Sequence, residues 1–102
     1  MAVENVLVQH IEKTPGVVGG KARIAGTRIR VMDIVVWHER QGMSPDEIVD
    51  MVDQISLADV YAALAYYFDN RSEIEMSFER EAELVQEYKQ KYPSKLREKL
   101  GG

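Results

Sequence analysis

The spacing of apolar residues along the chain changes at Val31. Before this residue, apolar and polar residues alternate in short runs, and after it apolar residues recur every three or four positions, as in helices. Two short extended runs flank Ala25-Gly26-Thr27, with Ile24 and Ile29 among their apolar anchors. This pattern predicts a small glycine-containing β-hairpin with helices packed behind it. Residues 1–14 alternate loosely and suit an edge strand or an extended arm.

Three helices are predicted after the hairpin. The first begins at Val31 and closes at Gly42, because glycine commonly ends helices. The second begins with a capping box, in which Ser44 is the N-cap and Glu47 lies three residues later. The third begins after Ser56, its N-cap. Its apolar positions are Leu57, Val60, Tyr61, Leu64 and Phe68. The expected fold class is mainly α with a short N-terminal β-hairpin, built on a tri-helical, helix-turn-helix (winged-helix-like) core.

A C-terminal helix is predicted from a further capping box at Ser72 to about Lys91. Its apolar residues form a narrow stripe between charged faces, which suits either packing on its own domain or docking into a groove of a partner protein. The residues assigned to partner binding are Ile74, Phe78, Val85 and Tyr88. We therefore divide the chain into a hairpin plus helix-turn-helix domain at 1–70 and a C-terminal helical partner-binding segment at 71–102.

Composition narrows the class of protein. The 102 residues suit a single domain, and 45% hydrophobic residues with 29% charged residues argue against wholesale disorder. The absence of cysteine excludes disulfides and thiolate metal sites. The N-terminus lacks a basic-then-apolar signal pattern, and no apolar run approaches the roughly 20 residues that span a bilayer. We expect a cytoplasmic protein that does not enter a membrane.

The net charge of −4 conceals a segregation of charge. Residues 1–32 hold five Lys and Arg against two acids, whereas residues 33–70 hold one Arg against eight acids. Four of the cations lie in the predicted hairpin, where alternating strands would carry them outward to contact DNA phosphates or base edges. They are Lys21, Arg23, Arg28 and Arg30. In the alternative interpretation, they form ion pairs with acidic helix residues of the same domain. The expected acids are Asp46, Glu47, Asp50 and Asp53.

The third helix is a poor candidate for reading DNA. The positions expected to face outward are Asp59, Ala62, Ala63, Tyr66 and Asn70. A helix that lies in the major groove normally carries cations or amides near its N-terminus, and this face has an acid there. Small residues favour a close helix–helix contact instead. We predict a dimerisation surface at Ala62, Ala63 and Tyr66.

Enzyme chemistry has little support in the sequence. His10 and His38 lack the spacing of a metal-binding pair, and the glycines of residues 16–20 lack the lysine and hydroxyl of a phosphate-binding loop. The acids of the second helix could be read as a magnesium site, but an acidic helix start explains them better. We expect no catalytic residue, no metal and no cofactor.

Four segments together resemble the domain-of-unknown-function 433 family. Their order and spacing match over about residues 8–75, with Gly-Gly-Lys and Gly-Thr-Arg-Ile as the most specific elements. Ala22 and Arg30 stand where proline is expected in many members of the family. The segments are Thr14–Lys21, Ile24–Ile29, Gly42–Ile48 and Leu57–Tyr67.

The resemblance implies a helix-turn-helix-like fold and a role as a VapB-like antitoxin of a bacterial type II toxin–antitoxin pair. A PIN-like ribonuclease toxin is the implied partner of the C-terminal region. A homodimer of the N-terminal domain and binding to its own promoter DNA are also implied. Two alternatives stay open: a free-standing helix-turn-helix DNA-binding regulator, and a structural dimerisation module in which the hairpin cations pair internally.

Overall fold

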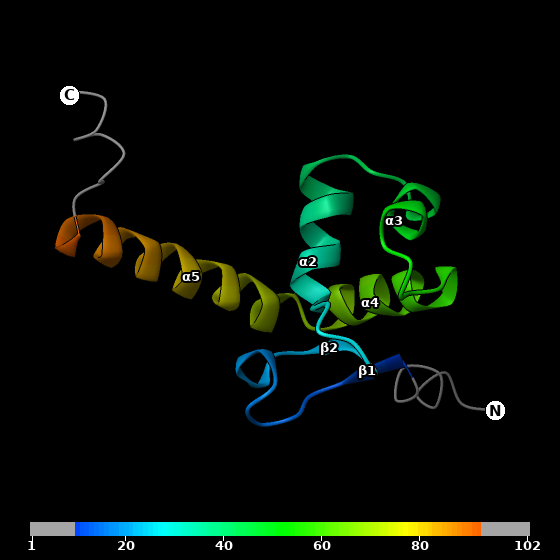
Figure 1. Cartoon of the computed structure of the whole chain (residues 1–102), viewed down its shortest axis with the longest axis horizontal. Helices are drawn as coiled ribbons and strands as arrows, with labels where there is room; N and C mark the ends of the chain where they lie inside the picture. The colour runs from blue at the N-terminus through cyan, green and yellow to red at the C-terminus, as the bar shows by residue number, and fades with distance from the viewer. Residues whose placement is uncertain (1–9, 93–102) are drawn as a thin grey trace.

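The computed structural model describes residues 10–92 as a compact helical domain with one helix leading away from it (Figure 1). The helices α2, α3 and α4 form the domain, and two short strands lie against α4 beside the start of α2. The predicted fold, mainly helical with a short N-terminal hairpin, is therefore confirmed. The helices and their extensions are α2 (Val31–Val35), its π-helical continuation η2 (Val36–Arg40), α3 (Pro45–Met51), α4 (Leu57–Asp69) and α5 (Arg71–Lys91).

The strand pairing differs in detail from the predicted hairpin. β1 (Ile11–Glu12) pairs antiparallel with β2 (Arg23–Ile24), and the short 3₁₀ segment η1 (Val18–Gly20) lies between them. The run that follows Gly26 returns to β2 only as a single bridge between Arg30 and Arg23. Gly26 allows this tight return because its φ of +77° lies in the region that side chains with a Cβ resist. We call residues 11–30 the ribbon.

Local capping signals set the helix boundaries, as predicted. The Glu47 N–H donates to Ser44 Oγ at 3.1 Å, and the Ser44 N–H donates to the Glu47 carboxylate at 2.9 Å. Ser56 and Asp59 form the same reciprocal pair at the start of α4. Gly42, with a φ of +72°, ends the helix that begins at Val31. These three predicted boundaries are confirmed.

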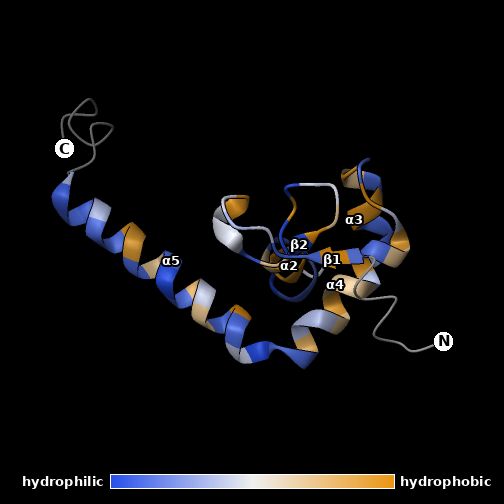
Figure 2. Ribbon diagram, turned by 90° about the horizontal axis from the view of Figure 1, so that it is seen from below, coloured by the Kyte–Doolittle hydropathy of each residue, from blue (hydrophilic) through white to orange (hydrophobic). Residues whose placement is uncertain are grey.

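The core gathers around α4, which contacts α2, α3, α5 and both strands. Val60 and Ala63 on α4 are fully buried, as are Val31 and Ile34 on α2 and Ile48 on α3. Figure 2 shows apolar residues concentrated in this part of the molecule and largely polar residues along α5. No described helix combines the length and apolarity needed to cross a membrane.

The face of α4 that packs inward differs from the prediction. Leu57, Tyr61 and Phe68, assigned to the apolar side, are 40%, 56% and 54% exposed. Ala62 and Ala63, expected to face outward, are buried. Val60 and Leu64 are buried as predicted, so the predicted orientation was wrong only in part. The error arises because α4 carries apolar residues around most of its circumference, and spacing alone does not select the inner face. Because α4 contacts α2, α3, α5 and both strands, its small residues Ala62 and Ala63 lie where these elements pack against it.

The start of α5 also differs from the prediction. The helix begins at Arg71, directly after a one-residue break at Asn70, and Ser72 lies within its first turn rather than at the N-cap. The Asn70 side chain donates to the Tyr66 carbonyl at 3.0 Å and so helps to close α4. The first turn of α5 then packs on the domain, because Ile74 belongs to the core. The domain boundary predicted at residue 70 therefore lies at the bend between α4 and α5, and residues on both sides of this bend pack in the same core.

Candidate partner-binding surface

Arg23 of the ribbon is buried, with 8% of its surface exposed, rather than carried outward as expected. Its guanidinium donates to Glu12 Oε2 at 2.6 Å, to Thr14 Oγ1 at 3.1 Å and to the Thr27 carbonyl at 2.8 Å. Among residues 10–92, its Nε is the one buried side-chain nitrogen or oxygen without a hydrogen-bond partner. Arg23 therefore ties together the strand, the connecting loop and the turn of the ribbon.

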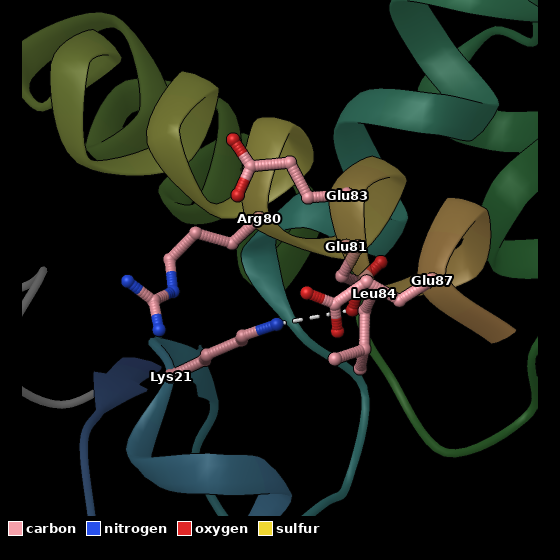
Figure 3. Close-up of a pocket in the computed structure, with 6 residues that line it drawn as sticks. All are labelled: Lys21, Arg80, Glu81, Glu83, Leu84 and Glu87. Atoms are coloured by element: carbon pink, nitrogen blue, oxygen red, sulfur yellow. Dashed lines mark hydrogen bonds and ion pairs between the residues drawn. The ribbon is translucent and has the colours of Figure 1, made fainter. Parts of the chain in front are cut away.

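Lys21 and Arg30 converge on one carboxylate of α5. Lys21 Nζ lies 3.0 Å and an Arg30 guanidinium nitrogen 2.6 Å from Glu81 Oε1, and Arg30 also pairs with Asp33 at 2.8 Å. The Lys21 hydrogen bond, opposed by burial and reinforced by Arg30, holds the pKa of Glu81 below its ordinary value. Figure 3 shows Lys21 reaching from the ribbon toward Glu81, beside an open pocket of about 380 Å³. These ion pairs join the middle of α5 to the ribbon.

Three of the four predicted DNA-contacting cations thus have carboxylate partners within the chain, and Arg28 is the one that is exposed. The internal-pairing interpretation describes this arrangement, although the acids differ from those expected. The partners are Glu12, Asp33 and Glu81, whereas the expected Asp46, Glu47, Asp50 and Asp53 are exposed. Sequence patterns did not reveal Glu81 because it lies 51 and 60 residues from its two partners. DNA contact by this surface stays a prediction.

Two further polar clusters hold α4 against its neighbours. His10 Nδ1 lies 2.6 Å from Asp59 Oδ1 at the start of α4. Burial opposes ionisation of Asp59, but hydrogen bonds from Ser56 and His10 outweigh it and lower the pKa of the carboxyl. At the other end of α4, Tyr66 donates to Glu73, which also pairs with Lys13 at 2.9 Å. Tyr66 is thus turned toward α5, so the predicted dimerisation set does not form an outward face.

The apolar stripe of α5 divides into two parts with different surroundings. Ile74 is buried, and Phe78 packs against the core beneath the Arg40 guanidinium, which lies 3.9 Å from its ring centroid. Beyond Glu81 the same stripe is more than half exposed, and Leu84 at its start borders the pocket that Lys21 of the ribbon also lines. We call this part the outer stripe: Leu84, Val85, Tyr88 and Tyr92, between 52% and 61% exposed, of which Leu84 and Tyr92 were not predicted.

The outer stripe is a contiguous apolar surface. Its four side chains, together with Lys89, line a shallow depression of about 300 Å³. The rings of Tyr88 and Tyr92 lie 5.6 Å apart between centroids, which places their faces along the same side of the helix. In the part of the chain from residue 10 to residue 92, no three histidine or acidic side chains gather in a way that could hold a metal ion.

Comparison with known proteins places the domain in a family. The model of the family described as protein of unknown function (DUF433) matches residues 11–67. A solved structure of a DUF433 member protein from Anabaena variabilis ATCC 29413 is 35% identical, with 72% of each chain covered and a TM-score of 0.64. No curated protein matches the chain. On the strength of the sequence match and the shared fold, the chain belongs to the DUF433 family.

Proposed function

We propose that this protein is the antitoxin of a type II toxin–antitoxin pair, and that it captures a PIN-like ribonuclease through the outer stripe of α5. The observation that carries the proposal is that the apolar stripe of α5 is buried near the start of the helix and exposed near its end. Ile74 is buried in the domain, whereas Val85 and Tyr88, on the same side of the helix, are more than half exposed. The outer stripe is thus the part of α5 that remains for a partner.

Helix-in-groove recognition explains how such a stripe binds. An amphipathic helix places side chains spaced three or four residues apart into an apolar groove of its partner. Val85, Tyr88 and Tyr92 have this spacing. Fully covering a large apolar side chain contributes roughly 1.5–3 kcal/mol, and the outer stripe residues, which are 52% to 61% exposed, have about half of that gain left to make on binding.

The attachment of α5 also favours binding. Ile74 and the ion pairs of Glu81 hold the first half of the helix on the domain. A helix that is already oriented loses less conformational freedom when it binds, and this preserves affinity. The outer stripe lies beyond the family match at residues 11–67, so the partner surface is an extension of the family domain. The PIN-like ribonuclease as occupant rests on the family resemblance.

Promoter DNA and a second copy of the chain are not required for this activity. Lys21, Arg23 and Arg30 are already paired with carboxylates, and a phosphate would have to displace those partners. Direct capture of the ribonuclease by α5 needs none of these cations. We therefore treat neutralisation of the toxin as the function and leave operator binding outside the proposal.

The Val85→Asp/Tyr88→Asp variant tests the capture. Co-expression with the product of the adjacent reading frame, followed by affinity purification, is expected to recover a complex with the wild-type chain. Half of the burial gain at two positions amounts to at least about 1.5 kcal/mol in total, a loss of roughly tenfold or more in affinity before the cost of burying two charges is added, so the variant should retain little of the ribonuclease.

A matched control is Gln86→Asp/Gln90→Asp, which adds the same charge to exposed positions on the opposite side of α5. This control should retain the ribonuclease at the wild-type level. Undiminished capture by the Val85→Asp/Tyr88→Asp variant would contradict the proposal, as would equal losses in both variants.

A further inference from the structure

Helix α5 is attached to the rest of the protein by two kinds of contact on successive turns. Near its start, Ile74 is buried and Phe78 packs against the core, so this part of the helix is held by apolar contacts. One turn later Glu81 is held by charge, through Lys21 at 3.0 Å and Arg30 at 2.6 Å. The attachment of α5 therefore changes from apolar to ionic between residues 78 and 81.

The ionic part of the attachment lies within reach of water. We call it the latch; it consists of Lys21, Arg30 and Glu81, whose side chains are 30%, 26% and 41% exposed. Salt screens partly exposed ion pairs, and the screening length falls from about 10 Å at 0.1 M to about 3 Å at 1 M ionic strength. Burial of an apolar side chain such as Ile74 has no such charge to screen. The latch is thus the part of the attachment that salt loosens.

Opening the latch strands no charge in the interior. Arg30 also pairs with Asp33 at 2.8 Å at the start of α2, so it keeps a carboxylate partner when Glu81 moves away. Lys21 and Glu81 are exposed enough to be hydrated once they separate. Breaking a deeply buried ion pair is costly because an unpaired charge stays behind. This cost does not arise here, so the latch can open while the domain stays folded.

A movement at the latch is amplified toward the end of α5. The helix continues from Glu81 to Lys91, which is about 15 Å at the rise of an α-helix. Its link to α4 is the single residue Asn70, whose φ of −133° and ψ of 42° lie outside the helical region. Figure 3 shows the Lys21–Glu81 pair beside Leu84, the first residue of the outer stripe. The latch therefore sets where the outer stripe lies relative to the ribbon.

We propose that the latch is an electrostatic switch, which holds α5 against the ribbon at low ionic strength and lets the helix pivot about Ile74 and Phe78 when salt screens it. The closed latch keeps the outer stripe in one orientation, whereas the open latch lets it take several. A helix that is already oriented loses less freedom on binding, so the closed latch favours capture of the ribonuclease. This consequence for capture rests on the proposed function, whereas the switch itself belongs to the free chain.

Distances between two spin labels test the switch in the free chain. The sequence has no cysteine, so Arg28→Cys in the ribbon and Gln86→Cys on α5, both at exposed positions, accept one label each. At about 0.1 M salt the labels should give a narrow distribution of distances, and at about 1 M salt the distribution should broaden. Adding Glu81→Gln should make the distribution broad at both salt concentrations, because this change removes the charge that both cations bind.

Two further variants separate the latch from a general effect of charge. Glu79→Gln makes the same change at an exposed position on another side of α5 and should leave the distribution narrow at low salt. Glu81→Lys places a third cation beside Lys21 and Arg30 and should broaden it. Lys21→Glu/Glu81→Lys reverses the pair and should narrow the distribution again. Circular dichroism verifies that each variant keeps its helices.

Capture of the ribonuclease is measured separately. Glu81→Gln should weaken capture by about threefold to tenfold at low salt, and Glu79→Gln should not change it. A distance distribution that ignores both salt and Glu81→Gln would overturn the switch, as would a reversed pair that stays broad. Full-strength capture by the Glu81→Gln variant would overturn its effect on binding. A wild-type chain that captures no ribonuclease would contradict the proposed function instead, and the distances in the free chain would still decide whether the switch exists.

Discussion

Replacing Ile74 with alanine is expected to lower the free energy of unfolding by about 3 kcal/mol, whereas Val85→Ala should change it by less than about 0.5 kcal/mol. Both residues were predicted from the sequence to bind a partner. Ile74 is 3% exposed within the core, so its truncation leaves a cavity. Val85 is 52% exposed and loses little on truncation. Urea denaturation followed by circular dichroism measures both values.

Met76→Ala provides a control within the same helix turn. Met76 is 59% exposed and lies two residues after Ile74, so its truncation changes a side chain of similar size without opening the core. Its effect should match that of Val85→Ala. If Ile74→Ala proved as mild as Met76→Ala, the first half of α5 would not be packed on the domain in solution.

The second large effect is expected at Arg23. Arg23→Ala should lower the free energy of unfolding by about 2 to 3 kcal/mol, because the buried guanidinium donates to three separate acceptors in the ribbon. The value is smaller than that of a fully buried ion pair because Glu12 is 42% exposed and is hydrated when its partner is lost. Thermal or urea unfolding of the full chain measures the difference.

Arg28→Ala is the matched control, because Arg28 lies in the same ribbon and is exposed. Its effect should stay within about 0.5 kcal/mol. Arg23→Lys should recover only part of the loss, since a single ammonium cannot reproduce the forked geometry of a guanidinium. Equal effects at the two arginines would contradict a structural role for Arg23.

The parts of the fold that depend on neighbouring residues were predictable from the sequence. Ser44 and Ser56 bond to residues only three positions away, so the chemistry that starts α3 and α4 is visible in a short window. The end of the first helix at Gly42 has the same local origin. At Asn70 the local signal failed, because a bend between two packed helices replaced the cap expected at Ser72.

The parts that depend on distant residues were not predictable. The pairing of Lys21 and Arg30 with Glu81 requires knowing that α5 returns past the ribbon. Burial of Ala62 requires knowing that α4 has neighbours on several sides. Strand alternation suggested outward cations, but Arg23 turned inward because acceptors from three segments surround it. Helical spacing found the stripe of α5 but not the point at which the domain stops covering it.

The ribbon and α5 have two separate roles that the sequence left together. The ribbon cations hold the ribbon and the base of α5, and the outer stripe is proposed to bind the ribonuclease. Each role lies on a different element, so each can be disturbed separately. Glu81 marks the boundary on α5, because its ion pairs with Lys21 and Arg30 are the last ion pairs that the described residues form between this helix and the ribbon.

Hydrogen exchange of the full-length protein, free and with the PIN-like ribonuclease, tests the central claim most directly. Slower amide exchange upon binding is predicted for residues 84–92, where the outer stripe becomes covered. Residues 74–78 should change little, because that part of α5 already packs on the domain. Slower exchange confined to the ribbon or to α4, with residues 84–92 unchanged, would contradict the proposed function.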